Sequence, residues 1–238
     1  MVKNHLSRLA VPKSWPVEKK KTRWIAKPIP GSHSLNGSIP LSVLLRDMLQ
    51  YAKTLKEIKL ILNQKNILVD KKARKESRFP IGFMDVVEFP SLGEYYRMVY
   101  NKKGVFSIIP ISKEQANLKL LKIIRKFLVK KGVMQLTFHD GRNIRVDQFN
   151  GNVGDTVLFD LNKKIISKIF HLDKGSLVYL NGGAHVSQLA KVKNVVKSRD
   201  LQSPKVVIDI NGEEYVTLMK YAFVVGKDKP ELTLGVGE

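Results

Sequence analysis

The chain has 238 residues, 43% of them apolar, and a formal charge of +21 from 42 basic and 21 acidic side chains. This length and composition are typical of one or two folded domains and exclude a wholly disordered chain. With no cysteine, the chain has neither a disulfide framework nor thiolate zinc sites. No apolar run approaches the roughly 20 residues of a membrane-spanning helix, so no membrane association is expected. We expect an intracellular, cytoplasmic protein whose charge is screened by a polyanion, and a nucleic acid is the expected partner.

The positive charge is unevenly spread along the chain. Residues 1–40, 41–106 and 107–170 carry +7, +6 and +7, whereas residues 171–238 carry only +1. We describe the chain in four parts: an extended basic N-terminal arm (1–40), a first module (41–106), a central β domain (107–170) and a C-terminal barrel (171–238). From the charge, nucleic-acid contacts are expected before residue 171 rather than in the barrel.

The arm shows neither a helical nor a strand-like apolar period, and the prolines at positions 12, 16, 28 and 30 interrupt regular structure. A disordered tail is one interpretation, but such tails are poor in aromatic residues. Tryptophans among basic residues suit stacking on bases and neutralisation of phosphates. We expect the arm to be ordered only against RNA, and its candidate RNA-binding residues are His5, Arg8, Lys13, Trp15, Lys19, Lys20, Lys21, Arg23, Trp24, Lys27 and His33.

Two short helices are predicted next. From Pro40, apolar residues follow the spacing of a core-facing helix through Leu49, and Thr54 with Glu57 forms a T-x-x-E capping box for a second helix. Short strands follow at "NILVD" and "DVVEF". We expect both helices to pack on a small curled sheet and to leave one basic outer face, formed by Arg46, Lys53, Lys56, Lys59, Lys71, Lys72, Arg74, Lys75 and Arg78.

Beyond residue 90 the pattern is mostly that of β-structure. Ser112 and Gln115 indicate a brief capped helix, and residues 118–131 fit a helix or a long strand equally well. The stretches "MQLTFHDGRNIRV" and "VVIDINGEEYVTL" predict hairpins with two-residue turns at Asp140-Gly141 and Asn211-Gly212. Four short strands between these hairpins have the regular spacing of a small barrel.

Seven stretches of this sequence resemble the archaeal and eukaryotic S4e family of small-subunit ribosomal proteins. They are "HLSRLAVPKSW", "PGSHSLNGSIPLSVLLRDMLQYAKTLKEIKLIL", "PIGFMDVVEF", "HDGRNI", "VGDTVLFDL", "VYLNGGA" and "FVVGK". The resemblance implies an α+β, multidomain fold: a small helical RNA-binding module with a curled sheet, like that of the bacterial ribosomal protein S4, then a central β domain and a C-terminal SH3-like KOW β-barrel. The lack of a basic extension after "KPELTLGVGE" indicates an archaeal member.

The function implied by this resemblance is that of a structural constituent of the small ribosomal subunit, which binds small-subunit rRNA and supports translation and subunit assembly. The expected partners are this rRNA and neighbouring ribosomal proteins, without a cofactor and without self-association.

The sequence departs from the family pattern in the KOW loop. Gly182, Gly183, Ala184 and Val192 fit the family pattern, but Ser187 and Ala190 stand where the family has glycine. The loop is therefore expected to be structural or to meet a protein, rather than to bind RNA tightly.

Other functional classes find little support in the sequence. The five histidines, at positions 5, 33, 139, 171 and 185, are scattered and do not predict a metal site. An RNA-modifying pseudouridine synthase would carry a catalytic aspartate in G-R-L-D, whereas "GRNIRVD" places Asp147 at the wrong spacing. A KOW-bearing transcription factor or a nucleoid protein would also be basic, but neither is expected to carry the "HLSRLAVPKSW" arm. We therefore expect no enzymatic activity.

Overall fold

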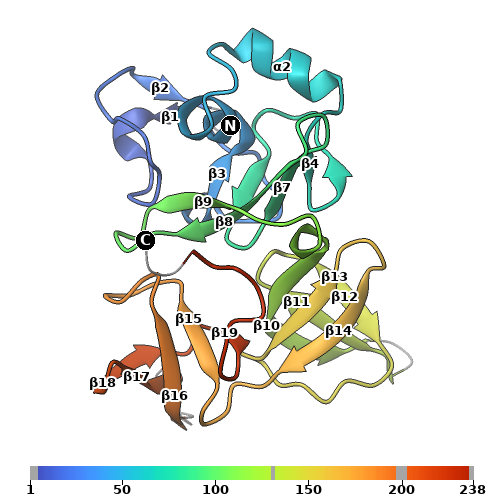
Figure 1. The fold of residues 1–238 in the computed structure, drawn as a ribbon, viewed down its shortest axis with the longest axis vertical. Helices are drawn as coiled ribbons and strands as arrows, with labels where there is room; N and C mark the ends of the chain where they lie inside the picture. Colours follow the sequence, from blue (N-terminus) through green and yellow to red (C-terminus); the bar gives the residue numbers. More distant parts are fainter. Residues whose placement is uncertain (1–4, 130–131, 197–202, 236–238) are drawn as a thin grey trace. The chain divides into compact units, whose positions relative to one another are not determined.

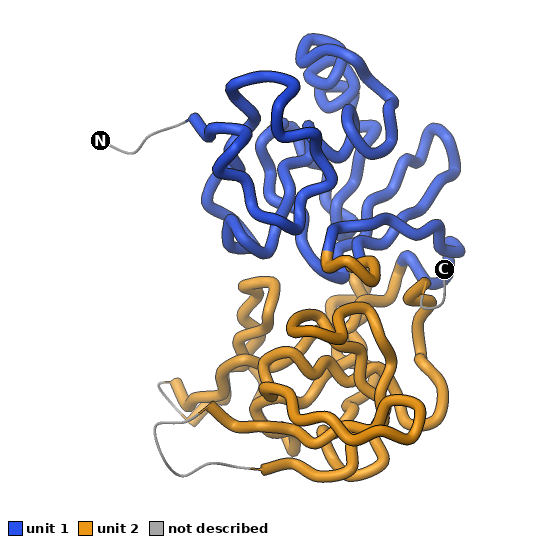
Figure 2. Tube along the Cα trace, turned by 90° about the vertical axis from the view of Figure 1, so that its left-hand side faces the viewer, with its two compact units in different colours: residues 1–99, 105–116 blue, residues 100–104, 117–238 orange. Residues whose placement is uncertain are grey.

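The computed structural model describes residues 5–129, 132–196 and 203–235, which are mostly β-strands with few helices (Figure 1). The chain forms two compact units (Figure 2). Unit 1 comprises residues 1–99 and 105–116, and unit 2 comprises residues 100–104 and 117–238. The finer division of the chain into an arm and three domains stays a prediction.

Unit 1 contains the arm, the first module without residues 100–104, and residues 107–116. Its main sheet has five strands in the order β5-β4-β7-β8-β9, with two smaller pairs, β1-β2 and β3-β6. The smaller pairs are β1 (Leu6–Ser7) with β2 (Trp24–Ile25), and β3 (Ser38–Pro40) with β6 (Pro80–Gly82). The main sheet consists of β4 (Leu68–Val69), β5 (Lys72–Ala73), β7 (Val86–Phe89), β8 (Glu94–Tyr100) and β9 (Phe106–Pro110).

The first predicted helix is shorter and less regular than the sequence pattern suggests. Only α1 (Leu41–Val43) is α-helical, and a π-helical turn, η3 (Leu44–Met48), follows it. The Leu49 N–H donates to the Leu44 carbonyl over 2.9 Å, and Gln50 then adopts a φ of 57°, which ends the helix. The apolar stripe itself is confirmed, because Leu41, Leu44 and Leu45 are completely buried.

The second helix begins where its capping box predicts. In α2 (Leu55–Asn63), the Glu57 N–H donates to the Thr54 hydroxyl oxygen over 3.3 Å, and the Glu57 carboxylate accepts the Thr54 N–H in return. The backbone N–H of Lys53 and the Thr54 side chain lower the pKa of Glu57. Ile58 and Leu62 are completely buried, whereas Leu55 remains half exposed.

The first sheet of unit 2 has the order β12-β11-β10-β13-β14. Residues 118–128 form a strand, since β10 pairs antiparallel with both β11 and β13; residues 130–131 of the ambiguous stretch lie outside the described residues. The predicted hairpin is confirmed, but its innermost hydrogen bond, from the Phe138 N–H to the Arg142 carbonyl, encloses three residues, 139–141, instead of the two that the sequence predicts. The strands are β10 (Leu118–Leu128), β11 (Met134–Phe138), β12 (Asn143–Val146), β13 (Thr156–Asp160) and β14 (Ile165–Phe170), and the short 3₁₀ helix η4 (Gln115–Asn117) precedes them.

The second sheet of unit 2, here called the C-terminal sheet, has the order β18-β17-β16-β15-β19. Its hairpin has the predicted two-residue turn: Ile210 pairs with Glu213, and Asn211 and Gly212 have φ values of 54° and 94°. The strands are β15 (Leu177–Leu180), β16 (Leu189–Val196), β17 (Lys205–Ile210), β18 (Glu213–Leu218) and β19 (Ala222–Gly226).

A buried lysine joins the two sheets of unit 2. The Lys122 ammonium group, on β10, donates to the carbonyls of Met219 and Ala222 over 2.6 and 2.5 Å, and to that of Lys220 over 3.2 Å. Burial lowers the pKa of Lys122 to about 8. These bonds satisfy three carbonyls of the turn between β18 and β19, so Lys122 fixes that turn onto the first sheet.

Candidate nucleic-acid interface

The arm has a core of its own within unit 1. Strands β1 and β2 close a loop, and the Arg8 N–H adds a bond of 2.9 Å to the Arg23 carbonyl beside them. The side chains of Val11, Trp15 and Ile25 are buried inside the unit. The arm thus has an apolar face that its sequence pattern does not reveal, because the buried Val11, Trp15 and Ile25 are spaced too irregularly to show a period.

Main-chain hydrogen bonds fix the arm to the first module. The Phe106 N–H donates to the Ser14 carbonyl over 2.8 Å, and the Ile29 N–H donates to the Arg78 carbonyl over 3.0 Å. Further along, β3 pairs with β6 in the register Ile39 to Ile81. These contacts join residues that lie far apart in the sequence, and they hold the arm on the first module.

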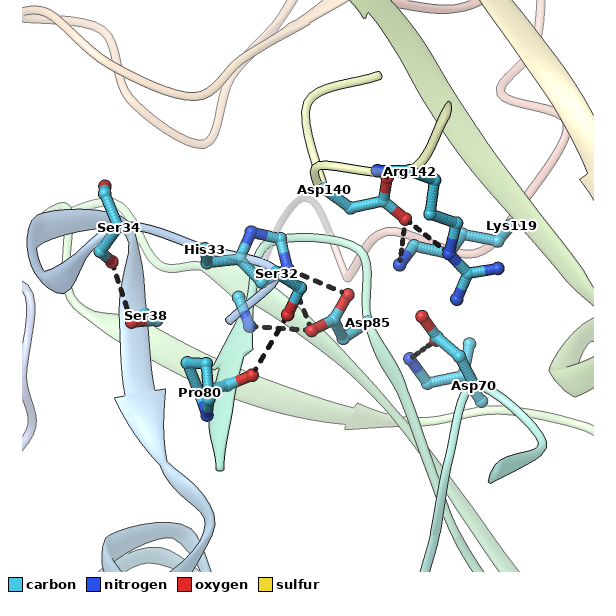
Figure 3. A network of polar contacts seen from close by, with 12 residues as sticks. Ser32, His33, Ser34, Ser38, Asp70, Pro80, Asp85, Lys119, Asp140 and Arg142 are labelled. Atoms are coloured by element: carbon cyan, nitrogen blue, oxygen red, sulfur yellow. Dashed lines mark hydrogen bonds and ion pairs between the residues drawn. The ribbon is translucent and has the colours of Figure 1, made fainter. Parts of the chain in front are cut away.

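His33 anchors the end of the arm rather than facing solvent (Figure 3). Its Nε2 lies 3.1 and 3.0 Å from the two carboxylate oxygens of Asp85, and one of these oxygens also accepts the Gly82 N–H over 2.8 Å. The His33 side chain is 6% exposed. A Cβ atom at Gly82 would approach the imidazole ring to 2.4 Å, so only glycine leaves room for this contact.

Two further predicted RNA-binding residues, Arg8 and Trp15, also point into the protein. Arg8 is 4% exposed and its Nη1 donates to the Glu18 carbonyl over 2.8 Å, while Trp15 is 3% exposed. Stacking of Trp15 on a base is thus replaced by packing in the core. Lys27 is half-buried, and the remaining arm candidates are exposed: His5, Lys13, Lys19, Lys20, Lys21, Arg23 and Trp24.

The exposed part of the arm combines an aromatic surface with cations. Trp24 is 49% exposed; the His5 ring packs edge-on against it at 4.9 Å, and the Arg23 guanidinium lies 4.9 Å from the Trp24 ring centroid. We call His5, Arg23 and Trp24 the Trp24 cluster. Lys19, Lys20 and Lys21 precede it in the loop that β1 and β2 close. Such a surface suits stacking of an unpaired base next to neutralised phosphates.

The nine predicted cations of the first module divide into two groups. Arg46 pairs with Asp47 over 2.8 Å, and Lys71 pairs with Glu88 over 3.0 Å. Burial raises the pKa of Glu88, against the effect of its bond to Lys71. Arg78 lies 3.9 Å from Glu76, and Arg74 lies over the Phe79 ring at 4.1 Å.

The second group consists of five exposed lysines, and no carboxylate among the described residues lies within ion-pair distance of their ammonium groups. Because no described carboxylate forms an ion pair with these lysines, their charges are available to phosphates. They lie in or next to α2 and the β4-β5 hairpin, and they are Lys53, Lys56, Lys59, Lys72 and Lys75.

Sequence reasoning missed an exposed basic and aromatic group in unit 2. Phe127 on β10 is 46% exposed and pairs with Gln135, which pairs in turn with the exposed Arg145 on β12. Arg125 lies two residues before Phe127 on the same strand. The +7 charge of residues 107–170 was the available signal, but the unresolved choice between helix and strand hid which side chains come together.

Within the described residues, the arrangement of side chains and helices bears on the metal-binding, membrane-spanning and enzymatic alternatives. No group of three His, Asp or Glu side chains there is arranged to hold a metal ion. No helix of that part of the chain is long and apolar enough to cross a membrane. The buried Asp140, next to the G-R dipeptide, forms ion pairs of 3.2 Å with Lys119 and 2.9 Å with Arg142, which is a structural role in the hairpin.

Comparison with known proteins connects this interface to a family. Residues 92–166 match the model of ribosomal family S4e, and residues 2–36 match that of the RS4NT domain. The small ribosomal subunit protein eS4 of Methanothermobacter thermautotrophicus is 37% identical and spans 99% of this chain and 98% of its own. That of Pyrobaculum islandicum is also 37% identical, over 97% of this chain and 98% of its own.

A solved structure agrees with these sequence matches. The crystal structure of the 30S ribosomal protein S4e from Thermoplasma acidophilum has a TM-score of 0.69 and 30% identity, and the alignment covers 81% of this chain and 96% of that one. The sequences of two relatives thus align with this chain over nearly their full length. The chain belongs to the ribosomal S4e family.

Proposed function

We propose that this protein is a structural constituent of the small ribosomal subunit, located in the cytoplasm, that binds small-subunit rRNA through its arm and first module. The observation that carries this proposal is the ordered arm, which buries Trp15 and His33 but presents the Trp24 cluster and three consecutive lysines to solvent. As a member of a ribosomal protein family, the chain is not an enzyme.

The mechanism is neutralisation of phosphates with stacking on a base. Exposed lysines and arginines release the counterions that surround the RNA backbone, and Trp24 offers an aromatic surface to an unstacked base. The arm is already folded, so little conformational entropy is lost when it binds. In the subunit the protein then helps to fix the rRNA fold and contacts neighbouring ribosomal proteins, and so supports assembly and translation.

The C-terminal part, residues 171–238, corresponds in this proposal to the SH3-like KOW barrel of the family. Ser187, at a position where the family has glycine, has a φ of 68° and is buried. Ala190 lies in β16, where it pairs with Val178. The left-handed backbone of the loop is thus kept without the glycine, which supports a structural role for this loop.

The first test is the salt dependence of binding between the full chain and small-subunit rRNA. If about eight phosphates are contacted, the logarithm of the affinity falls with the logarithm of the salt concentration at a slope of roughly −5 to −7. A slope near zero contradicts the mechanism. Sedimentation of the tagged chain with small subunits in stoichiometric amount tests its place in the particle, and a chain that stays at the top of the gradient refutes it.

A matched pair of variants tests the location of the interface. Replacement of Lys19, Lys20, Lys21 and Arg23 by alanine is expected to reduce the salt slope by about 3 and to leave the unfolding midpoint nearly unchanged, because these side chains are exposed. The control removes the same charge from exposed lysines of the C-terminal part: Lys174, Lys191, Lys227 and Lys229. Equal losses in both variants would show that binding follows net charge only.

A further inference from the structure

The C-terminal sheet borders a groove that rRNA binding does not use. The groove has a volume of about 290 Å³, and it is bounded on one side by the loop after β15 and on the other by β18. The Tyr221 ring packs against Gly182 so closely that a Cβ atom there would lie 2.4 Å from it, while the His185 and Tyr215 rings lie 4.2 Å apart. The walls are therefore mainly aromatic and aliphatic.

The groove runs along a free strand edge. Strand β18 is the last in its sheet, and among the described residues it pairs only with β17. Four consecutive residues of β18, 215–218, line the groove, although alternate side chains of a strand point to opposite faces. The groove thus follows the strand edge itself, and Val216 is 67% exposed there. An open edge of this kind presents unpaired N–H and C=O groups to an added strand.

The charge at the hairpin end of this edge is opposite to that of the protein as a whole, whereas at the other end the Lys220 ammonium group lies 4.8 Å from the centroid of the Tyr221 ring. Residues 209–215 contain Asp209, Glu213 and Glu214 and no basic residue, in a chain of net charge +21. Lys193 compensates part of this charge, since its ammonium group lies 3.0 Å from Asp209 and 2.9 Å from Glu214. Glu213 accepts the Tyr215 hydroxyl, which raises the pKa of Tyr215. One lysine and three carboxylates leave the hairpin acidic.

We propose that β18 and its groove bind a basic, extended segment of another protein of the small subunit, which adds a strand to the sheet and places one apolar side chain between Tyr215 and Tyr221. The acidic hairpin attracts such a segment and repels the phosphates of RNA. This surface goes beyond the proposed rRNA binding, because none of the cations of the arm or the first module takes part in it.

The first experiment measures binding of the full chain to a labelled peptide of alternating lysine and valine with a central phenylalanine. Binding is expected although the chain as a whole repels this peptide, and the same peptide with glutamate in place of lysine is expected not to bind. N-methylation of alternate peptide bonds should abolish binding, because it removes the donors that pair with β18. A wild-type chain that does not bind the lysine peptide refutes the proposal.

A charge-reversed variant and its control locate the site. Glu213→Lys with Glu214→Lys is expected to weaken peptide binding by about tenfold or more, because it makes the hairpin basic. The control, Glu18→Lys with Glu114→Lys, has the same net charge, changes two exposed carboxylates of unit 1 and is expected to bind like the wild type. Equal weakening in the two variants would contradict the proposed location.

A photo-crosslinker at Val216 in assembled small subunits identifies the occupant. We expect a crosslink to a lysine- and arginine-rich extended segment of a ribosomal protein, lost in the Glu213→Lys, Glu214→Lys variant. A crosslink to rRNA, or none to protein, overturns the proposal. The peptide assay contains no RNA, so its outcome is independent of whether the arm binds rRNA.

Discussion

In the arm, strands of two residues are held in place by single inward side chains, whereas the C-terminal sheet is held by continuous ladders of four to eight residues. The two regions also treat charge differently. Residues 1–40 carry +7 with exposed lysines and Arg23, while residues 171–238 carry +1, and Lys193 there is paired with two carboxylates. The net charge of the arm requires an external counter-charge, whereas the opposite charges of residues 171–238 nearly cancel, although the hairpin of β17 and β18 is locally acidic.

The comparison also separates two uses of the same residue type. Trp15 and Trp24 lie nine positions apart, but Trp15 is 3% exposed and Trp24 is 49% exposed. The first holds the arm on the module, and the second belongs to the surface that we propose for RNA. The effects of replacing each tryptophan should therefore fall on different measurements.

The largest effect is expected for Trp15→Ala, which removes a buried aromatic side chain from the core of unit 1. We expect the free energy of unfolding to fall by about 3 to 5 kcal/mol, measured by circular dichroism in increasing urea. Trp15→Phe serves as the control and should lose much less, since it leaves a smaller cavity. An unchanged midpoint for Trp15→Ala would show that the arm contributes no core.

In unit 2 the corresponding test concerns Lys122, whose pKa burial lowers from 10.5 to about 8. Below pH 8 both states bind the proton; between pH 8 and 10.5 the unfolded state binds more protons, so the free energy of unfolding rises with pH. Over this range the free energy of unfolding of the wild type should rise by about 3 kcal/mol relative to that of Lys122→Met. Lys191→Met, at an exposed lysine, is the control, and its free energy of unfolding relative to the wild type should not change with pH.

If the free energy of unfolding of Lys122→Met relative to the wild type also did not change with pH, the three carbonyls would stabilise the ammonium group enough to restore an ordinary pKa. The two sheets of unit 2 would then be joined by a permanent charge. The outcome thus distinguishes a buried cation that is costly near neutral pH from one that its carbonyl partners fully compensate.

Features specified by neighbouring residues were predictable from the sequence. The capping box at Thr54 and Glu57 and the Asn211-Gly212 turn are such features, and both are present. The turn of the other hairpin was misjudged by one residue, because Asp140-Gly141 fits both turn lengths and the Phe138 to Arg142 pairing decides between them. The S4e family was also recognisable from its motifs.

Features that depend on distant contacts were not predictable. The sequence left 118–131 undecided, because "LKLLKIIRK" fits an amphipathic helix; in the structure Lys119 and Lys122 are buried, which requires Asp140 and the carbonyls of residues 219–222. Likewise, no residue near His33 in the sequence indicates that Asp85 is its buried partner. The exposed residues of the candidate interface could be predicted from charge, whereas the burial of other candidates, such as Trp15 and His33, depends on tertiary packing.

A smaller effect, on binding alone, is expected for Trp24→Ala. Loss of the aromatic surface should weaken binding of the full chain to small-subunit rRNA by about 1 to 3 kcal/mol, while the stability changes by less than about 1 kcal/mol. Leu9→Ala is a suitable control on the same arm, because Leu9 is 69% exposed and offers no ring for stacking. If Trp24→Ala binds rRNA like the wild type, the arm acts through charge alone.

The smallest effect concerns Ser187 and Ala190, the two positions of the C-terminal part where the resemblance implies glycine. Ser187 adopts a φ of 68°, whereas Ala190 lies in β16 and is 2% exposed. Glycine should therefore be favourable only at the first. We expect Ser187→Gly to be more stable than Ser187→Ala by about 1 kcal/mol, since both lose the hydroxyl but only alanine keeps the strained Cβ.

At the second position the sign reverses: Ala190→Gly should lower the free energy of unfolding by about 0.5 to 1 kcal/mol, because glycine weakens a strand interior. Urea unfolding of the four proteins, followed by circular dichroism, provides the comparison. If glycine stabilised both positions, the loop would be under strain along its whole length. Opposite signs would mean that the backbone at Ser187 favours glycine whereas Ala190 favours strand structure, as expected for a loop that supports the sheet rather than binding a phosphate.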